Sequence, residues 1–271
     1  MARELILAKT AEEAVTAKTG SAVFVAGGTE VNRLGSEKAE KADILISLKK
    51  CSGLSDITAS VGYVTIGSMC TFQQLVESDA VPGYIREAAL FMGSRTRRNM
   101  ATIGGNIAAL RDDSYLIPVL IAAGAVIEIA GHGGAGERMG IEEYIGRFDE
   151  CKDSLMTSVT VPEEIKIVSK RYSNTAQSHA VLTMAASLTE DGFSLAAALK
   201  NSGIYRFIDF EKAIKADPGM SDDAIIEWFR SYDGVSVEKD MFGGTDYKRY
   251  LLGVTAADMY RHLTEGGRRD D

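Results

Sequence analysis

The sequence predicts an α+β protein of two domains, and two features of its pattern indicate this fold class. Up to about residue 164, short apolar runs typical of strands alternate with short helical stretches. From about Lys166 onward, a pair of extended runs is followed by three helical stretches, the order expected of a separate α+β domain. The predicted domains are 1–164, with lobes of about 1–53 and 54–164, and a smaller one at 165–271.

The first lobe is predicted to begin with a β-α-β unit. A strand is predicted at residues 5–8, and Thr10-Ala11-Glu12-Glu13 has the pattern of a capping box that starts a helix. The apolar runs 22–26 and 43–48 are short and continuous, so each predicts a buried strand. A strand, a helix and a further strand in this order indicate parallel pairing.

The second lobe is predicted from a longer series of shorter signals. Thr71-Phe72-Gln73-Gln74 repeats the capping pattern ahead of a short helix. The glycines at 102–106 predict a turn. The remaining elements are strands at 61–68, 125–130 and 158–161, and helices at 84–92 and 115–123.

The C-terminal domain is predicted to open with a hairpin. The extended runs 180–189 and 193–200 flank Asp191-Gly192, a dipeptide that favours a two-residue turn. Helices are expected at 210–215, 222–231 and 246–263, and the tail 266–271 is expected to fray.

Composition excludes several classes of protein. The 271 residues carry a formal net charge of −8, whereas general binding to nucleic acid needs clustered positive charge. The three cysteines, Cys51, Cys70 and Cys151, form no C-x-x-C pair, so we expect no zinc or iron–sulfur site on this chain. Unpaired cysteines fit a reducing cytoplasm, and the lack of an apolar run of eighteen residues predicts no membrane span.

Two glycine-rich stretches are candidates for binding a phosphate group. In Val23–Glu30 a buried strand runs into Gly27-Gly28, where backbone amides can approach an anion; a purely structural turn explains this pattern equally well. In Arg97–Asn106 two glycines are bracketed by Thr102 and Asn106, whose side chains can orient a pyrophosphate. Neither stretch has the G-x-G-x-x-G spacing, which disfavours a Rossmann NAD site.

The ordered pair of motifs, Ala26–Thr29 and then Ala101–Asn106, resembles the FAD-binding subunit of molybdenum hydroxylases of the xanthine dehydrogenase and carbon monoxide dehydrogenase kind. Leu155–Pro162 is similar to the strand and proline that close the family's FAD domain, and Ser169–Tyr172 to the start of its C-terminal domain. The resemblance implies a two-lobed FAD-binding domain of the molybdopterin dehydrogenase type, followed by a smaller α+β domain.

The resemblance also implies the residues that hold FAD. The pyrophosphate and ribityl chain would lie between two loops, made of Val25, Ala26, Gly27, Gly28, Thr29 and Glu30 and of Ala101, Thr102, Ile103, Gly104, Gly105 and Asn106. A family aspartate after the second motif corresponds by spacing to Tyr115, with Asp113 two residues earlier, and either residue could take its role. Lys170 matches a family lysine near the flavin ring.

The implied function is electron transfer within a complex. Electrons would pass from a [2Fe-2S] subunit through FAD to NAD or another acceptor, while a further partner subunit holds the molybdenum cofactor. No catalytic side chain and no metal ligand is expected on this chain. Two alternatives remain: a free-standing flavoprotein oxidoreductase, or a non-catalytic scaffold whose FAD site has decayed.

Two further stretches can be explained by structure alone, without a binding role. Gly131–Gly136 follows a predicted strand and contains no lysine or hydroxyl, so a flexible hairpin-like turn is favoured over a phosphate loop. Arg95, Arg97 and Arg98 form a basic patch that fits a solvated helix end and electrostatic support of a pyrophosphate or partner equally well.

Overall fold

The computed structural model describes residues 4–33, 36–131 and 136–265, and it confirms the α+β fold class. The chain forms two compact units. Unit 1 comprises Met1–Leu110 and Gly124–Glu163, and unit 2 comprises Arg111–Ala123 and Glu164–Asp271. A short internal segment, residues 111–123, therefore packs with the C-terminal residues. The compact units are defined by contacts, so the predicted domain boundary between residues 164 and 165 stays a prediction.

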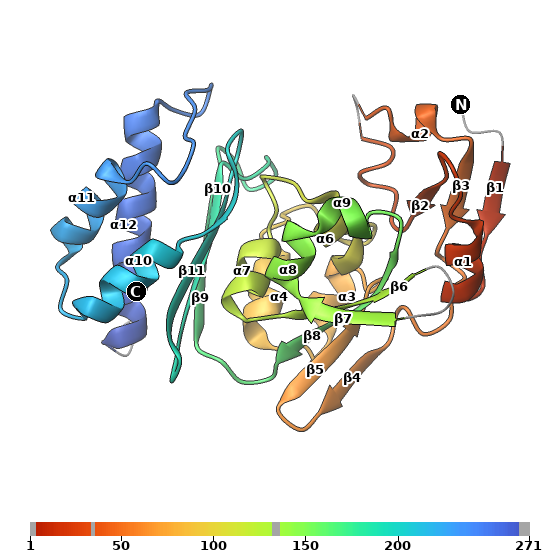
Figure 1. Ribbon diagram of the computed structural model, residues 1–271, viewed down its shortest axis with the longest axis horizontal. Helices are drawn as coiled ribbons and strands as arrows, with labels where there is room; N and C mark the ends of the chain where they lie inside the picture. Colours follow the sequence, from red (N-terminus) through yellow and green to blue (C-terminus); the bar gives the residue numbers. More distant parts are fainter. Residues whose placement is uncertain (1–3, 34–35, 132–135, 266–271) are drawn as a thin grey trace. The chain divides into compact units, whose positions relative to one another are not determined.

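Unit 1 begins with a small parallel sheet. Strands β1 (Glu4–Leu7), β2 (Val23–Val25) and β3 (Ile44–Ser47) lie in the order β1-β3-β2 (Figure 1). Helix α1 (Ala11–Ala17) follows β1, and the hydroxyl of its N-cap Thr10 accepts the amide of Glu13 at 3.1 Å. The predicted β-α-β start is thus confirmed, with β3 between β1 and β2. A single helical turn, α2 (Lys38–Lys41), precedes β3.

The larger sheet of unit 1 is antiparallel throughout. Its strands are β4 (Ile57–Ser60), β5 (Tyr63–Gly67), β6 (Val126–Ala130), β7 (Gly136–Gly140) and β8 (Leu155–Pro162), in the order β4-β5-β8-β6-β7. The predicted strands correspond to β5, β6 and β8. The two edge strands were not predicted because they bury almost nothing: only Met139 of β7 is buried, and three of the four residues of β4 are exposed.

The turn predicted at Gly131–Gly136 has its centre, residues 132–135, outside the described residues. The strands on either side of it, β6 and β7, pair with Ala130 opposite Gly136, which is the pairing of a hairpin.

Short helices complete unit 1. They are α3 (Phe72–Glu77), α4 (Gly83–Leu90), α5 (Arg95–Arg98), α6 (Ile103–Ala109), α8 (Ile141–Gly146) and α9 (Phe148–Cys151). The predicted capping box of α3 is confirmed, since Thr71 and Gln74 bond each other's backbone amides. The turn predicted at 102–106 is wrong: Thr102 caps α6, and both glycines lie in its first turn. Tertiary packing of those glycines, described below, overrides their low helix propensity.

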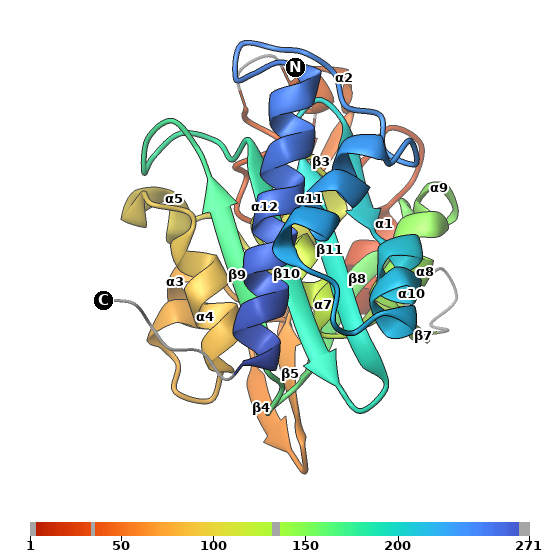
Figure 2. The ribbon, with the colours of Figure 1, turned by 90° about the vertical axis from the view of Figure 1, so that its left-hand side faces the viewer.

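Unit 2 is a four-stranded antiparallel sheet with helices on both faces. The strands are β9 (Ile167–Tyr172), β10 (Leu182–Thr189), β11 (Gly192–Leu199) and β12 (Gly203–Arg206), in the order β12-β11-β10-β9. Helices α10 (Ile208–Ala216), α11 (Asp222–Ser231) and α12 (Thr245–Thr264) cover one face, and α7 (Ile117–Ala122) lies against the other (Figures 1 and 2). The three predicted C-terminal helices and the hairpin are confirmed.

The internal segment is held in unit 2 by burial and by a hydrogen bond. All six residues of α7 are buried. The buried hydroxyl of Ser187, on β10, donates to the carbonyl of Ala122 at 2.7 Å. Helix α7 therefore forms part of the unit 2 core although its sequence lies between two stretches of unit 1.

The turn of the predicted hairpin is shifted by one residue. Thr189 pairs with Gly192, so the two turn residues are Glu190 and Asp191. Gly192 has φ of +127°, a backbone conformation that favours glycine, and it opens β11 instead of completing the turn.

Candidate functional site

A cavity of about 390 Å³ lies within unit 1, and both glycine motifs line it. Its volume falls in the range of small-molecule sites, about 300–1,000 Å³. From the predicted site, the residues that line it are Ala26, Gly27, Gly28, Thr29, Glu30, Thr102, Gly104 and Gly105. Val25, Ala101, Ile103 and Asn106 stand next to these in the chain but do not line the cavity. The structure thus brings together two motifs that are some seventy residues apart in the sequence.

Close backbone contacts explain why glycines occupy these positions. A Cβ atom on Gly27 would lie 1.5 Å from the carbonyl oxygen of Met100, the residue before Ala101. A Cβ atom on Gly104 would lie 2.6 Å from Cβ of Ser68, in the segment between β5 and α3. Since real side chains never approach so closely, only glycine allows the first motif to touch the second and α6 to pack on Ser68.

The backbone amides of the two motifs differ in their hydrogen bonding. In the second motif, the amides of Ile103, Gly104, Gly105 and Asn106 all donate to acceptors within the chain, at 2.9 to 3.1 Å. In the first motif, the amides at 27–29 donate to no acceptor within the described part of the chain. Gly28 has φ of +75°, which lets consecutive amides turn toward one side. The first loop therefore offers hydrogen-bond donors to an anion, and the second provides the rigid surface beside it.

Thr102 links the second motif to the cavity. Thr102 is 3% exposed, and its hydroxyl accepts a hydrogen bond from the amide of Gly105 at 3.1 Å. We expect Thr102→Ala to lower the free energy of unfolding by about 1 kcal/mol, because a helix N-cap is lost. The change is measured by urea unfolding. Thr102→Ser is the matched control and keeps wild-type stability; equal losses for serine and alanine would contradict the capping role.

The rest of the cavity wall is formed by residues that were not among the predicted FAD-binding residues. Three aromatic side chains line it, from Phe24 on β2, Tyr144 on α8 and Phe148 on α9. Lys18 and Asp153 also line it and form an ion pair of 2.5 Å. They lie outside both glycine motifs and follow no spacing rule, so only the folded chain reveals them.

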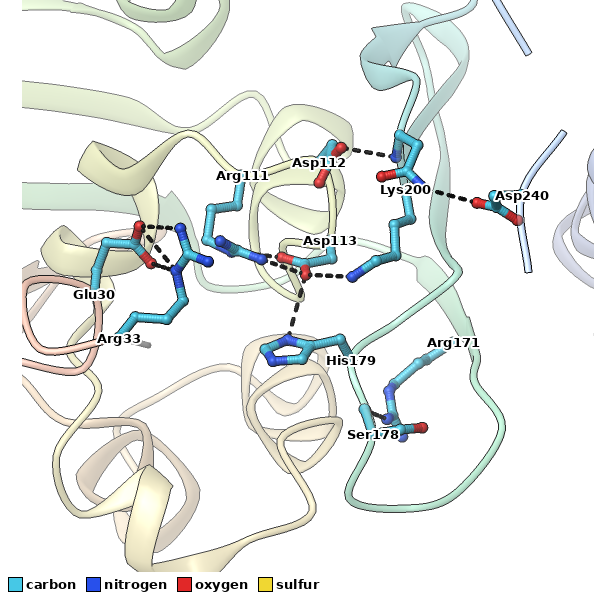
Figure 3. Close-up of polar contacts among 11 residues, drawn as sticks. Glu30, Arg33, Arg111, Asp112, Asp113, Arg171, Ser178, His179, Lys200 and Asp240 are labelled. Atoms are coloured by element: carbon cyan, nitrogen blue, oxygen red, sulfur yellow. Dashed lines mark hydrogen bonds and ion pairs between the residues drawn. The ribbon is translucent and has the colours of Figure 1, made fainter. Parts of the chain in front are cut away.

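Asp113 lies in unit 2 at the centre of a cluster of basic residues (Figure 3). The Asp113 side chain is 3% exposed, and the Arg111 guanidinium donates a hydrogen bond to each carboxylate oxygen, at 2.7 and 2.6 Å. Lys200 and His179 contact Oδ2 at 3.2 and 3.3 Å. Burial opposes the charged carboxylate, but the hydrogen bonds and charge of Arg111, with His179 and Lys200, hold the pKa of Asp113 below its ordinary value.

The same segment is anchored to unit 2 by its other acidic residue. The carboxylate of Asp112 accepts the backbone amide of Asn201 at 2.8 Å, and the Asn201 side chain donates to Asp240 at 2.8 Å (Figure 3). Asp240 in turn pairs at 2.7 Å with Lys248, whose side chain is completely buried in α12. A chain of polar contacts therefore joins residues 112 and 113 to the sheet and to the last helix.

The other two predicted residues also belong to unit 2. Tyr115 is buried, with the Arg171 guanidinium 5.5 Å from the centre of its ring. Lys170 pairs with Asp258 on α12, so its side chain lies on the opposite face of the sheet from α7. Its neighbour Arg171, on the α7 face, bonds the carbonyl oxygens of residues 175, 176 and 178.

Among the described residues, no group of three or more His, Cys, Asp and Glu side chains is arranged to hold a metal ion. None of the described helices combines the length and apolar character needed to span a membrane. Cys51, Cys70 and Cys151 are free and buried.

Comparison with known proteins agrees with this geometry. Residues 2–164 match the family model described as the FAD binding domain in molybdopterin dehydrogenase. The uncharacterized protein YgfM of Escherichia coli (strain K12) is 31% identical over 249 residues, covering 91% of this chain and 89% of that protein. The glyceraldehyde dehydrogenase medium chain of Sulfolobus acidocaldarius is 22% identical, with 88% of this chain and 89% of that protein covered.

A solved structure of carbon monoxide dehydrogenase from Hydrogenophaga pseudoflava has a chain of the same fold, with a TM-score of 0.81 at 19% identity over 97% of this chain and 98% of that one. The glycine-lined cavity, with amide donors on its first loop, fits a nucleotide diphosphate cofactor. The resemblance seen in the sequence is thus confirmed, and the chain belongs to the FAD-binding oxidoreductase family of the molybdopterin dehydrogenases.

Proposed function

We propose that this chain is the FAD-binding electron-transfer subunit of a molybdenum hydroxylase related to xanthine dehydrogenase and carbon monoxide dehydrogenase. When bound, FAD supplies the redox chemistry, accepting electrons from a partner's [2Fe-2S] cluster and passing them to NAD or another acceptor. Family membership and the cavity formed by both glycine motifs carry the proposal.

The protein's own contribution is to bind and orient the cofactor. The loop Val25–Glu30 supplies amide donors to the pyrophosphate, and Ala101–Asn106 provides the packed surface that holds this loop in place. For the flavin end of the cofactor, we propose the residues that the family resemblance implies, Asp113 or Tyr115 and Lys170. Because Asp113 already receives four contacts from the basic residues Arg111, His179 and Lys200, we propose that Asp113 fixes the segment that carries Tyr115.

Partner chains are part of the proposal because the relatives belong to larger enzymes. The glyceraldehyde dehydrogenase relative is a medium chain, and the carbon monoxide dehydrogenase of Hydrogenophaga pseudoflava was solved without the Mo-pyranopterin moiety of its molybdenum cofactor. This chain has three scattered cysteines, whereas a [2Fe-2S] cluster needs four ligands. We therefore assign the clusters and the molybdenum cofactor to partner subunits, and the free cysteines fit a cytoplasmic complex.

The first test is cofactor content. We expect the purified chain to release FAD in a 1:1 ratio on denaturation, identified by chromatography. We also expect bound flavin to be reduced only when the cluster subunit and its electron source are added. Reduction by a small substrate without partners would identify a free-standing oxidoreductase. A chain that binds no FAD, alone or with partner subunits, would be a scaffold with a decayed site.

A further inference from the structure

Two acidic residues line the unit 1 cavity, and they are held in different ways. The carboxylate of Glu30 pairs with the guanidinium of Arg33 at 3.2 Å and with the ammonium of Lys38 at 4.0 Å. The Glu30 side chain is 20% exposed. Asp153, in the turn between α9 and β8, is contacted by Lys18 through Oδ1, and its side chain is 61% exposed. Asp153 is thus the more accessible carboxylate of the cavity wall.

Lys18 is suited to hold that carboxylate in one place. Its side chain is only 10% exposed, and its ammonium lies 2.5 Å from Asp153 and 6.0 Å from the centre of the Phe24 ring. Lys18 follows α1 and Phe24 lies on β2, so the ammonium is fixed by two elements of the parallel sheet's layer. A carboxylate accepts about four hydrogen bonds, so Asp153 can bind hydroxyl groups while it keeps its contact with Lys18.

We propose that Asp153 accepts the ribose 2′- and 3′-hydroxyls of the adenosine half of FAD, and that Lys18 is the positioning residue that holds Asp153 for this contact. The inference rests on the proposed function, in that FAD occupies this cavity. Carboxylates bind ribose hydroxyls in the same way in other adenine dinucleotide sites. A carboxylate repels phosphate groups but accepts O–H donors, which selects the sugar over the pyrophosphate as its partner.

The size and lining of the cavity favour the adenosine half over the flavin half. At about 390 Å³ the cavity is near the lower end of the range for small-molecule sites, so it has room for one ring system of FAD and not both. The ring that exchanges electrons has to be reached by a donor and an acceptor, so the ring held against this wall is the adenine. Phe24, Tyr144 and Phe148 give this ring an apolar, aromatic wall.

The test measures displacement of FAD by nucleotides that lack the flavin. We expect ADP to displace FAD from the wild-type chain and 2′,3′-dideoxy-ADP to bind at least about tenfold more weakly, because charge-assisted hydrogen bonds are lost. In Asp153→Ala the two nucleotides bind equally. Glu150→Ala is the matched control: Glu150 is a nearby acid, 69% exposed and paired with Arg147, neither residue lines the cavity, and this variant keeps the wild-type preference.

Lys18 is tested by the same ratio of dissociation constants. We expect Lys18→Met to lose most of the preference for ADP and Lys18→Arg to retain it. A purely structural role would lower thermal stability and leave the ratio unchanged, which would overturn the positioning role.

The possible failures are distinguishable. If the wild-type chain binds no FAD, the proposed function fails. If it binds FAD but ADP has no advantage over its dideoxy form, or Asp153→Ala keeps that advantage, only the inference about Asp153 is overturned. Displacement of FAD by FMN and not by ADP would overturn it as well, by assigning the cavity to the flavin half.

Discussion

Replacing Gly27 by alanine is expected to abolish stoichiometric FAD binding, with an affinity at least a hundredfold below that of the wild type. The added Cβ atom would lie 1.5 Å from the backbone oxygen of Met100, where a rotamer change cannot relieve the contact. The first glycine loop therefore has to move away from the second, and residues 27–29 lose their position in the cavity wall. We expect a loss of at least about 3 kcal/mol in the free energy of unfolding, at the upper end of overpacking effects.

The measurement is FAD titration by flavin fluorescence, with circular dichroism to verify that the variant is folded. Gly146→Ala is the control. Gly146 ends α8, and a Cβ atom there meets nothing within 4 Å. This variant is expected to bind FAD normally and to be as stable as the wild type or slightly more so. Normal FAD affinity in a folded Gly27→Ala chain would show that contact between the loops is not required.

Replacing Asp113 by asparagine is expected to destabilise the chain by about 3–5 kcal/mol, the range found when one partner of a buried ion pair is removed. Asparagine has nearly the same shape, so the effect comes from charge: Arg111 and Lys200 lose the buried carboxylate that neutralises them. Urea unfolding at neutral pH measures the loss. The control is Asp209→Asn, because Asp209 is 62% exposed and paired with Lys212 at the surface, and a change within about 0.5 kcal/mol is expected.

The pH dependence of this difference tests its electrostatic origin. Because the pKa of Asp113 is lowered in the folded chain, the charged carboxylate stabilises the fold above its unfolded-state pKa of 3.8. This contribution is lost as the pH falls through the still lower folded-state pKa. The gap in unfolding free energy between wild type and Asp113→Asn is therefore greatest near neutral pH and shrinks under acid conditions. A gap that does not change with pH would indicate a packing defect.

Much of the fold could be predicted from local signals. Helix α11 begins and ends where the sequence indicates, since Ser221 caps it and its apolar residues recur at helical spacing. The capping patterns at Thr10 and Thr71 mark two helix starts correctly, but the full capping box forms only at Thr71, since the Glu13 side chain accepts the amide of Lys9 and not that of Thr10. Strands β9 and β12 were missed for a physical reason: they are only partly buried, so their sequences lack the apolar character of a core strand.

The candidate site shows where local reasoning ends. Glycine propensity predicts a turn at 102–106, yet α6 forms there because a helix is the conformation that packs against Ser68. The motifs identify the first loop, but only the folded chain shows that the amides at 27–29 donate to none of the described residues, whereas those of the second loop are satisfied. Likewise, Lys18 and Asp153 meet through tertiary structure alone, since each is an ordinary surface residue type in its own segment.

Helix α7 has a consequence for the order in which the chain folds during synthesis. Its six residues leave the ribosome with the rest of unit 1, but β10 and β11, which bury them, begin only at Leu182 and Gly192. Until those strands are translated, the nascent chain carries an unprotected apolar helix that a chaperone can recognise. A fragment that ends at residue 164 would retain this helix permanently, so it would aggregate unless residues 111–123 were replaced by a short polar linker.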